Sequence, residues 1–196
     1  MIGLAILAVG LYFAWPYLQA QFAPAGGGSG GGGPFPPASS DTPSSPTPAP
    51  PTLAPNVAAI VTLVLQYAGN QDPALVLGII ERESNFNPGA VNSSDPNGGS
   101  WGLMQMAAAT ARDMGVGDPR ALLQPAVAIA AGVRYLDWID RYLASRTGGG
   151  LNQKIAAWNE GPAAAASGLP DYPYVAAVTA NMAKWRGYLD SAVATS

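Results

Sequence analysis

The chain has 196 residues, a net charge of −3, and neither histidine nor cysteine. These two absences exclude disulfide scaffolds, thiolate zinc sites, cysteine nucleophiles and every triad or metal site that needs histidine. The 9 basic residues form no long run, which argues against a nucleic-acid-binding surface. Any chemistry must therefore use carboxylates, amides, hydroxyls and aromatic rings.

The first 22 residues are predicted to form a transmembrane anchor. Residues 2–18 carry no charged side chain, and with their neighbours they reach the roughly 17–25 apolar residues that one membrane-spanning helix needs. Trp15 and Tyr17 lie near the end of this run, where interfacial aromatic residues are common. A cleaved signal peptide is the alternative. Against it, no Lys or Arg precedes the run, which is also longer than a usual signal-peptide core.

Residues 23–55 have the composition of a linker. Residues 26–33 are glycine apart from one serine, which predicts a flexible joint. Residues 34–55 are dense in Pro, Ser, Thr and Ala, which favours an extended polyproline II conformation. Fully extended at about 3.1 Å per residue, this second half spans on the order of 70 Å. A plain disordered spacer is equally consistent with the composition.

Residues 56–196 are predicted to form one compact, mainly α domain. Apolar residues recur at helical spacing, no strand-like alternation or internal repeat stands out, and about 140 residues suffice for a core. The expected helices run from a cap at Asn56 to near Gly69, from Pro73 to about Glu83, from about Ala107 to near Gly115, and over residues 125–143, 152–159 and 174–189. A long loop rich in Asn, Ser, Asp and Gly spans residues 88–100.

Glu83 is the first candidate for chemistry. Asp72-Pro73 has the form of a helix cap followed by proline at the first helical position. On that helix Glu83 extends the apolar face of Ile79 and Ile80, so we expect burial to raise the pKa of its carboxyl. A general acid needs such a pKa. Glu81, rotated by about 200°, should face solvent or a surface partner. A structural role for Glu83 stays open from the residues alone.

Several motifs resemble, in order, those of the soluble lytic transglycosylase family, a lysozyme-like superfamily acting on peptidoglycan. The matching stretches are Glu83-Ser84-Asn85-Phe86-Asn87-Pro88, Gly102-Leu103-Met104-Gln105, Ala131-Gly132-Val133-Arg134-Tyr135-Leu136, Ala156-Ala157-Trp158-Asn159-Glu160-Gly161-Pro162 and Tyr174-Val175. The resemblance covers roughly residues 72–178 and implies a lysozyme-like helical domain with a long active-site loop.

The resemblance also implies roles for individual residues. Glu83 would be the sole catalytic acid/base. The residues that would bind or shape the sugar cleft are Ser84, Met104, Gln105, Trp158, Asn159 and Tyr174. Trp158 stands where the family usually has tyrosine. Without the resemblance, capping would explain Gln105 and Asn159, and core packing would explain Met104. The family implies no metal and no organic cofactor.

The implied reaction cleaves the β-1,4 bond between N-acetylmuramic acid and N-acetylglucosamine and leaves a 1,6-anhydro-muramic acid end. A hydrolytic muramidase is the first alternative, with Asp95 as a second carboxylate about 6.5–9.5 Å from Glu83. Glu160 is a weaker candidate for that second carboxylate. Asp95 in Asp-Pro-Asn-Gly also fits a simple Asx turn. The second alternative is an inactive, membrane-tethered module that only binds glycan.

The expected partners are peptidoglycan strands and, through the N-terminal helix, a membrane, with the catalytic domain on the cell-wall side. Wall remodelling, assembly of an envelope-spanning apparatus and phage infection or host lysis all fit this organisation. A virion-associated protein is therefore among the expectations, and a nucleic-acid partner is not.

Overall fold

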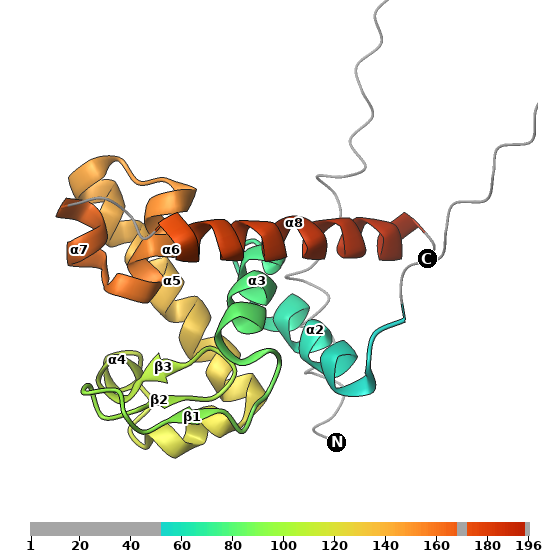
Figure 1. The fold of residues 1–196 in the computed structure, drawn as a ribbon, viewed down its shortest axis with the longest axis horizontal. Coiled ribbons are helices and arrows are strands. Elements are labelled where there is room, and N and C mark those ends of the chain that lie inside the picture. Colours follow the sequence, from blue (N-terminus) through green and yellow to red (C-terminus); the bar gives the residue numbers. More distant parts are fainter. Residues whose placement is uncertain (1–51, 168–171, 195–196) are drawn as a thin grey trace, which may run out of the picture. The chain divides into compact units, whose positions relative to one another are not determined.

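The structure is a computed structural model that describes residues 52–167 and 172–194. These residues belong to one compact unit and are mostly helical, so the predicted mainly α fold is confirmed (Figure 1). The elements are α2 (Pro55–Tyr67), α3 (Pro73–Ser84), β1 (Val91–Asn92), β2 (Ser100–Trp101), β3 (Met106–Ala107), α4 (Ala108–Asp113), the 3-10 helix η1 (Pro119–Leu123), α5 (Pro125–Thr147), α6 (Leu151–Glu160), α7 (Pro162–Ser167) and α8 (Tyr172–Ala194).

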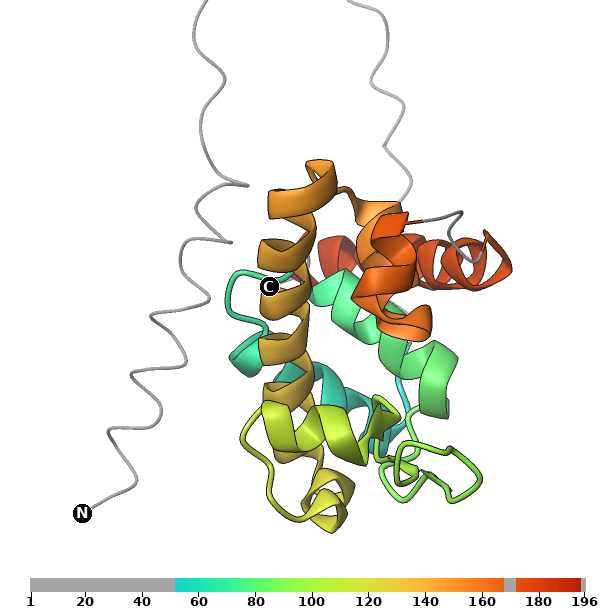
Figure 2. The ribbon, with the colours of Figure 1, turned by 90° about the vertical axis from the view of Figure 1, so that its left-hand side faces the viewer.

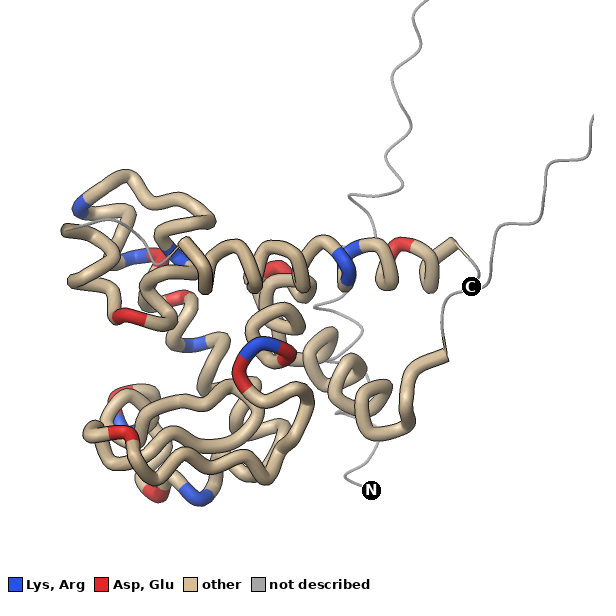
Figure 3. Tube along the Cα trace, in the orientation of Figure 1, with Lys and Arg blue, Asp and Glu red and all other residues tan. Residues whose placement is uncertain are grey.

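The predicted anchor, residues 1–22, and most of the predicted linker, residues 23–55, lie outside the described residues. Within the described part, no helix is both long and apolar enough to cross a membrane. Along the described part of the trace, charged positions are spread over several elements and form no long stretch of one sign (Figure 3). This distribution agrees with the absence of a basic run in the sequence.

The helix starts follow local sequence in two different ways. The side chain of Asp72 accepts a hydrogen bond of 2.8 Å from the backbone nitrogen of Ala74, and Pro73 is the first residue of α3. This cap was predicted and is confirmed. The predicted cap at Asn56 is wrong, because α2 already begins at Pro55 and Ala54 precedes it without a capping side chain. Proline preorganises the first turn there and lacks the N–H that a cap would satisfy.

Helix α3 packs against α8, and the two helices cross (Figure 1). The closest approach is at Gly78, where an added Cβ would lie 3.1 Å from the backbone of Met182 and of Val178. Further along α3, Glu81 accepts a hydrogen bond of 2.7 Å from the indole nitrogen of Trp185 and pairs with Lys184. Glu81 therefore faces α8, with a surface lysine as its partner as expected. These contacts fix the helix that carries Glu83.

The loop predicted over residues 88–100 and the residues that follow it contain strands that the sequence did not reveal. The strands β1, β2 and β3 form an antiparallel sheet in that order, with Val91 paired with Trp101 and Ser100 paired with Ala107. Each strand has two residues, which is too short for an alternating pattern to be recognised. The sheet gives the loop a fixed path beside the N-terminal half of α5 (Figure 1).

Helix α5 connects two parts of the core. Its buried residues include Ile129, Leu136, Ile139 and Leu143, which belong to the larger apolar cluster with α2, α3, α6 and α8. A smaller cluster beneath the sheet joins Ala131 of α5 to residues of β3, α4 and η1. Helices α6 and α7 pack beside the C-terminal half of α5 (Figure 2). The short helix α7 was not predicted.

Candidate functional site

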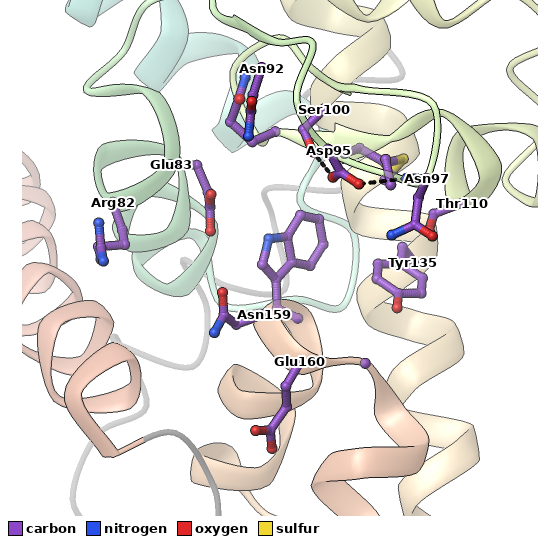
Figure 4. Close-up of a pocket in the computed structure, with 15 residues that line it drawn as sticks. Arg82, Glu83, Asn92, Asp95, Asn97, Ser100, Thr110, Tyr135, Asn159 and Glu160 are labelled. Carbon is purple, nitrogen blue, oxygen red and sulfur yellow. Dashed lines mark hydrogen bonds between the residues drawn. The ribbon is translucent and has the colours of Figure 1, made fainter.

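A cavity of about 500 Å³ lies where the C-terminal end of α3, the sheet, the middle of α5 and the C-terminal end of α6 meet. Its lining is mostly polar and is formed by Arg82, Glu83, Asn92, Asp95, Asn97, Ser100, Gln105, Met106, Ala107, Thr110, Tyr135, Trp158, Asn159, Glu160 and Gly161 (Figure 4). Pockets that bind ligands commonly have this size. Four of the predicted site residues, Glu83, Gln105, Trp158 and Asn159, line this pocket together with Asp95.

Glu83 lies in the last turn of α3, just beyond the fully buried Ile79 and Ile80. Its half-buried carboxyl accepts a hydrogen bond at Oε1 from the hydroxyl of Tyr174 on α8. Burial raises the pKa of the carboxyl, while the Tyr174 hydrogen bond and the neighbouring Arg82 guanidinium act in the opposite direction. The net shift is upward because loss of water disfavours the charged form most strongly. The raised pKa was predicted and is confirmed.

The residues after Glu83 turn the chain sharply out of the helix. Asn85 and Phe86 have left-handed backbone conformations, with φ of 49° and 62°. Phe86 is buried, and its ring meets that of Trp185 edge to face at 5.1 Å. Asn87 then accepts a hydrogen bond of 3.0 Å from the backbone of Gly89, which closes an Asx turn. The motif therefore ends α3 at Ser84, one residue after Glu83, which lines the pocket.

Ser84 and Met104 lie beside the pocket lining and are not part of it. The hydroxyl of Ser84 donates to the carbonyl of Ile80, one turn back in its own helix, at 3.1 Å. Met104 is fully buried, and its sulfur lies 2.2 Å from the position that a Cβ on Gly132 would occupy. The same position is 3.4 Å from the ring of Trp158. Met104 therefore packs beneath the pocket, against the helix that supports the Trp158 ring.

Gln105 holds the loop together while it faces the pocket. Its amide nitrogen donates to the carbonyl oxygens of Ala90, at 3.1 Å, and Gly102, at 2.9 Å. These bonds leave the amide oxygen as the atom best suited to accept a hydrogen bond from a ligand. Gly102 has a φ of 72°, and a Cβ there would lie 2.0 Å from the carbonyl oxygen of Leu122. Glycine is thus required at this position of the motif.

Asp95 reaches the pocket from the loop between β1 and β2, on the other side from Glu83 (Figure 4). One carboxylate oxygen accepts from the Ser100 hydroxyl, and the other accepts from the backbone nitrogen of Asn97 at 2.8 Å. These hydrogen bonds lower the pKa of Asp95. The Asx turn that the sequence favoured is therefore present, and it keeps this carboxylate ionised and tied to its own loop.

The end of α6 contributes three consecutive residues, Trp158, Asn159 and Glu160. Asn159 is exposed and lies on the same side of the pocket as Glu83, whereas the Glu160 carboxylate points away from Glu83 (Figure 4). One oxygen of Glu160 is buried without a hydrogen-bond partner in the described part of the chain. Glu160 is thus less suited than Asp95 to hold a water molecule opposite Glu83.

Several lining residues were not predicted as site residues, among them Arg82, Asn92, Thr110 and Tyr135. Arg82 directly precedes Glu83, and its guanidinium lies 5.5 Å from the ring centre of Tyr174. Tyr135 belongs to one of the stretches that resemble the family's motifs, so the resemblance could have identified it as a site residue. Asn92 and Thr110 belong to the sheet and α4, and only the folded loop brings them to the pocket.

The arrangement offers one carboxyl that is protonated more readily than usual, surrounded by amides, hydroxyls and aromatic rings. That set can donate a proton to a glycosidic oxygen and bind a neutral sugar that carries acetamido groups. No group of three or more acidic side chains in residues 52–167 and 172–194 is arranged to hold a metal ion.

Comparison with known proteins agrees with this reading of the pocket. The family model described as "Transglycosylase SLT domain" matches residues 63–169, which include α3, the sheet, α5 and α6. No solved structure matches the chain. The matched region covers more than half of the chain and contains every residue that lines the pocket. The chain therefore belongs to the SLT transglycosylase family, a group of peptidoglycan-cleaving enzymes in the lysozyme-like superfamily.

Proposed function

We propose that this protein is a peptidoglycan lytic transglycosylase in which Glu83 acts first as an acid and then as a base. The single observation that supports this most directly is the half-buried Glu83 carboxyl, whose pKa is raised and whose position Tyr174 fixes. A carboxyl with a raised pKa in the lining of a polar pocket suits the first step, which needs a general acid.

In the first step, Glu83 gives its proton to the oxygen that bridges N-acetylmuramic acid and N-acetylglucosamine. The bond between C1 of the muramyl residue and that oxygen breaks, and the substrate's own acetamido oxygen shares the positive charge on C1. In the second step, the Glu83 carboxylate removes the proton of the muramyl C6 hydroxyl. The C6 oxygen bonds to C1 and closes the 1,6-anhydro ring, and Glu83 is again protonated.

A hydrolytic muramidase is the second candidate, because Asp95 lines the same pocket as Glu83. In that reaction Asp95 would hold the water molecule that attacks C1. Both oxygens of Asp95 already accept hydrogen bonds from its own loop, which favours a structural role. The lyase, which needs one carboxyl used twice, fits the pocket with fewer assumptions. The inactive glycan-binding module has least support, because Glu83 is intact and the pKa of its carboxyl is raised.

Mass analysis of the fragments released from purified peptidoglycan by the full chain tests the proposal. A lyase leaves anhydro-muramic acid ends, which are lighter by one water molecule than the reducing ends that a hydrolase leaves. Reducing ends would contradict the lyase and support the muramidase. Absence of any fragment, together with binding of intact strands by both the wild type and a Glu83→Gln variant, would support the inactive module.

We further propose that the domain acts on the cell-wall side of a membrane to which residues 1–22 anchor it. The apolar run and the long Pro-rich spacer support this proposal. Protease added to intact spheroplasts that express the full chain should remove the domain and leave a membrane-bound N-terminal fragment. A domain that is protected until the membrane is opened would contradict it. Wall remodelling, envelope-apparatus assembly and phage infection or host lysis remain alternative settings.

A further inference from the structure

A continuous row of aromatic rings leads out of the pocket along α5. Trp158 and Tyr135 line the pocket, and their ring centres are 5.4 Å apart. Tyr135 stacks on Trp138, with ring centres 5.9 Å apart and planes inclined by only 14°. The centre of the Tyr142 ring lies 5.2 Å from that of Trp138. These four residues, Trp158, Tyr135, Trp138 and Tyr142, are called the aromatic row below.

The row follows one face of α5. Tyr135, Trp138 and Tyr142 are separated by three and four positions, which places their side chains one above another on a helix. From Tyr135 to Tyr142 the helix rises by about 10 Å. At the far end, the guanidinium of Arg146 lies 3.8 Å from the ring centre of Tyr142 and donates to the carbonyl oxygen of Tyr142 at 3.3 Å. The row therefore leads from the pocket lining along α5 and ends at a positive charge.

Core packing accounts for only part of the row. Tyr135, Tyr142 and Trp158 are partly buried and pack against the apolar core. Trp138 does not belong to that packing, and 37% of its surface is exposed. Burial in the core therefore does not explain the position of this large ring. Its nearly parallel contact with Tyr135 places it next to a residue that lines the pocket.

We propose that the aromatic row binds the sugar units of a glycan strand that continues beyond the pocket, with Trp138 as its main contact. A pyranose ring has an apolar face of C–H groups, and the negative face of an aromatic ring attracts such positively polarised hydrogens. The row is continuous with the pocket, so a strand held at Glu83 can continue along it. This inference rests on the proposed function and names a second part of the same substrate site.

The same rings could instead contact a lipid surface, where tryptophan and tyrosine are also common. The geometry favours the glycan. Trp138 stacks on Tyr135, and the row begins in a pocket whose lining is mostly polar.

Binding of two glycan lengths to the full chain tests the proposal, with a Glu83→Gln background to prevent cleavage. The short chain fills only the pocket, and the long chain reaches Tyr142. We expect Trp138→Ala to weaken binding of the long chain about tenfold more than that of the short chain. Trp138→Phe, which keeps a ring, should recover most of the loss. Tyr67→Ala is the matched control, because Tyr67 is also 37% exposed but lies on α2 outside the pocket lining.

Equal affinity of Trp138→Ala and the control for both lengths would overturn the proposal. The proposal would also be overturned if the Glu83→Gln parent bound the long chain no more tightly than the short one. In that case cleavage of the short chain by the wild type would still support the proposed function. A different outcome is that the wild type cleaves no chain while Trp138→Ala still weakens binding of the long chain more than that of the short one. That outcome would overturn the proposed function and still support glycan binding by the aromatic row. Unchanged glycan binding with weaker partitioning of Trp138→Ala onto phosphatidylglycerol vesicles would assign the row to a membrane.

Discussion

The hydroxyl of Tyr174 donates a hydrogen bond to Oε1 of Glu83, and so joins the C-terminal helix α8 to the candidate catalytic carboxyl. This bond stabilises the charged form of Glu83 and works against the burial that raises its pKa. It also holds the carboxyl in one orientation. The predicted cleft residue Tyr174 thus contacts Glu83 and is not among the residues that line the pocket.

Replacement of Tyr174 by phenylalanine should shift the pH dependence of cleavage. Loss of the hydrogen bond raises the pKa of Glu83 further, because the remaining large influence is burial. Glu83 must be protonated to act as an acid, so the fall in kcat/KM at high pH should move to higher pH in the variant. Well below that fall, the rate should stay within about tenfold of the wild type, since one hydrogen bond is lost and the acid is retained.

The pH–rate profile of peptidoglycan solubilisation measures both effects. A profile that keeps its position while the rate drops at every pH would mean that Tyr174 contributes only structure.

Replacement of Glu83 by glutamine should reduce cleavage by about 10²–10⁴, the usual contribution of a general acid/base, while strand binding is preserved. Release of soluble fragments and co-sedimentation with insoluble peptidoglycan measure the two properties. Glu81→Gln is a suitable comparison, because Glu81 is two residues away and contacts α8 outside the pocket. Substantial cleavage by the Glu83→Gln variant would remove Glu83 from the mechanism.

The same variant should change how stability depends on pH. The folded pKa of Glu83 lies above its ordinary value of 4.5, so the folded wild type binds the proton more tightly than the unfolded chain. The stabilisation from that proton is fully present below the unfolded pKa and is lost as pH rises through the folded pKa. Glutamine cannot titrate.

The unfolding free energy of Glu83→Gln relative to the wild type should therefore increase over that pH range and then level off. Denaturant titrations at several pH values measure this difference. A difference that is constant with pH would contradict the raised pKa.

Substitution of Gly102 by alanine should destabilise the fold by at least about 2 kcal/mol. An L residue is strained at the positive φ of Gly102, and the Cβ of the alanine would clash with the carbonyl group of Leu122. Gly115→Ala separates the two causes. Its φ of 84° is similarly unfavourable, but no atom lies within 4 Å of the added Cβ, so the cost should be only about 1 kcal/mol. Thermal unfolding of both variants checks the difference, and equal losses would mean that the loop shifts to accommodate the added methyl group.

Replacement of Asp95 by asparagine distinguishes the lyase from the hydrolase. If Asp95 only closes its turn, the variant should retain cleavage within about tenfold, since asparagine can still accept one of the two hydrogen bonds. If Asp95 holds the attacking water, loss of its charge should lower the rate by about 10²-fold or more. Ser100→Ala removes one hydrogen bond of the turn and leaves the carboxylate in place, and it serves as the control for loop disorder.

Local sequence determined more of the fold than of the site. Asp72-Pro73 predicted the start of α3 because a cap acts within a few residues. The apolar stripe before Glu83 predicted its raised pKa, since both features belong to one helix. The two-residue strands and α7 escaped prediction because such short segments carry no periodic signal.

The contacts that define the pocket depend on distant parts of the chain. Tyr174 reaches Glu83 across 91 residues, and Glu81 meets Trp185 across 104. No local pattern in the sequence encodes such pairs, although the family resemblance indicated that Tyr174 belongs near the cleft. The positions of Ser84 and Met104 beside the pocket lining likewise depend on the turn after α3 and on packing in the core.

The dependence of α3 on α8 has a consequence for biosynthesis. A ribosome makes the chain from the N-terminus, so Tyr174 is added 91 residues after Glu83, which takes roughly 5–20 s at usual elongation rates. Until then the carboxyl lacks its hydroxyl partner, and Gly78 and Glu81 lack the helix that covers them. A nascent or prematurely terminated chain therefore lacks the contacts that complete the candidate site, so any activity of that site can appear only after α8 has been made.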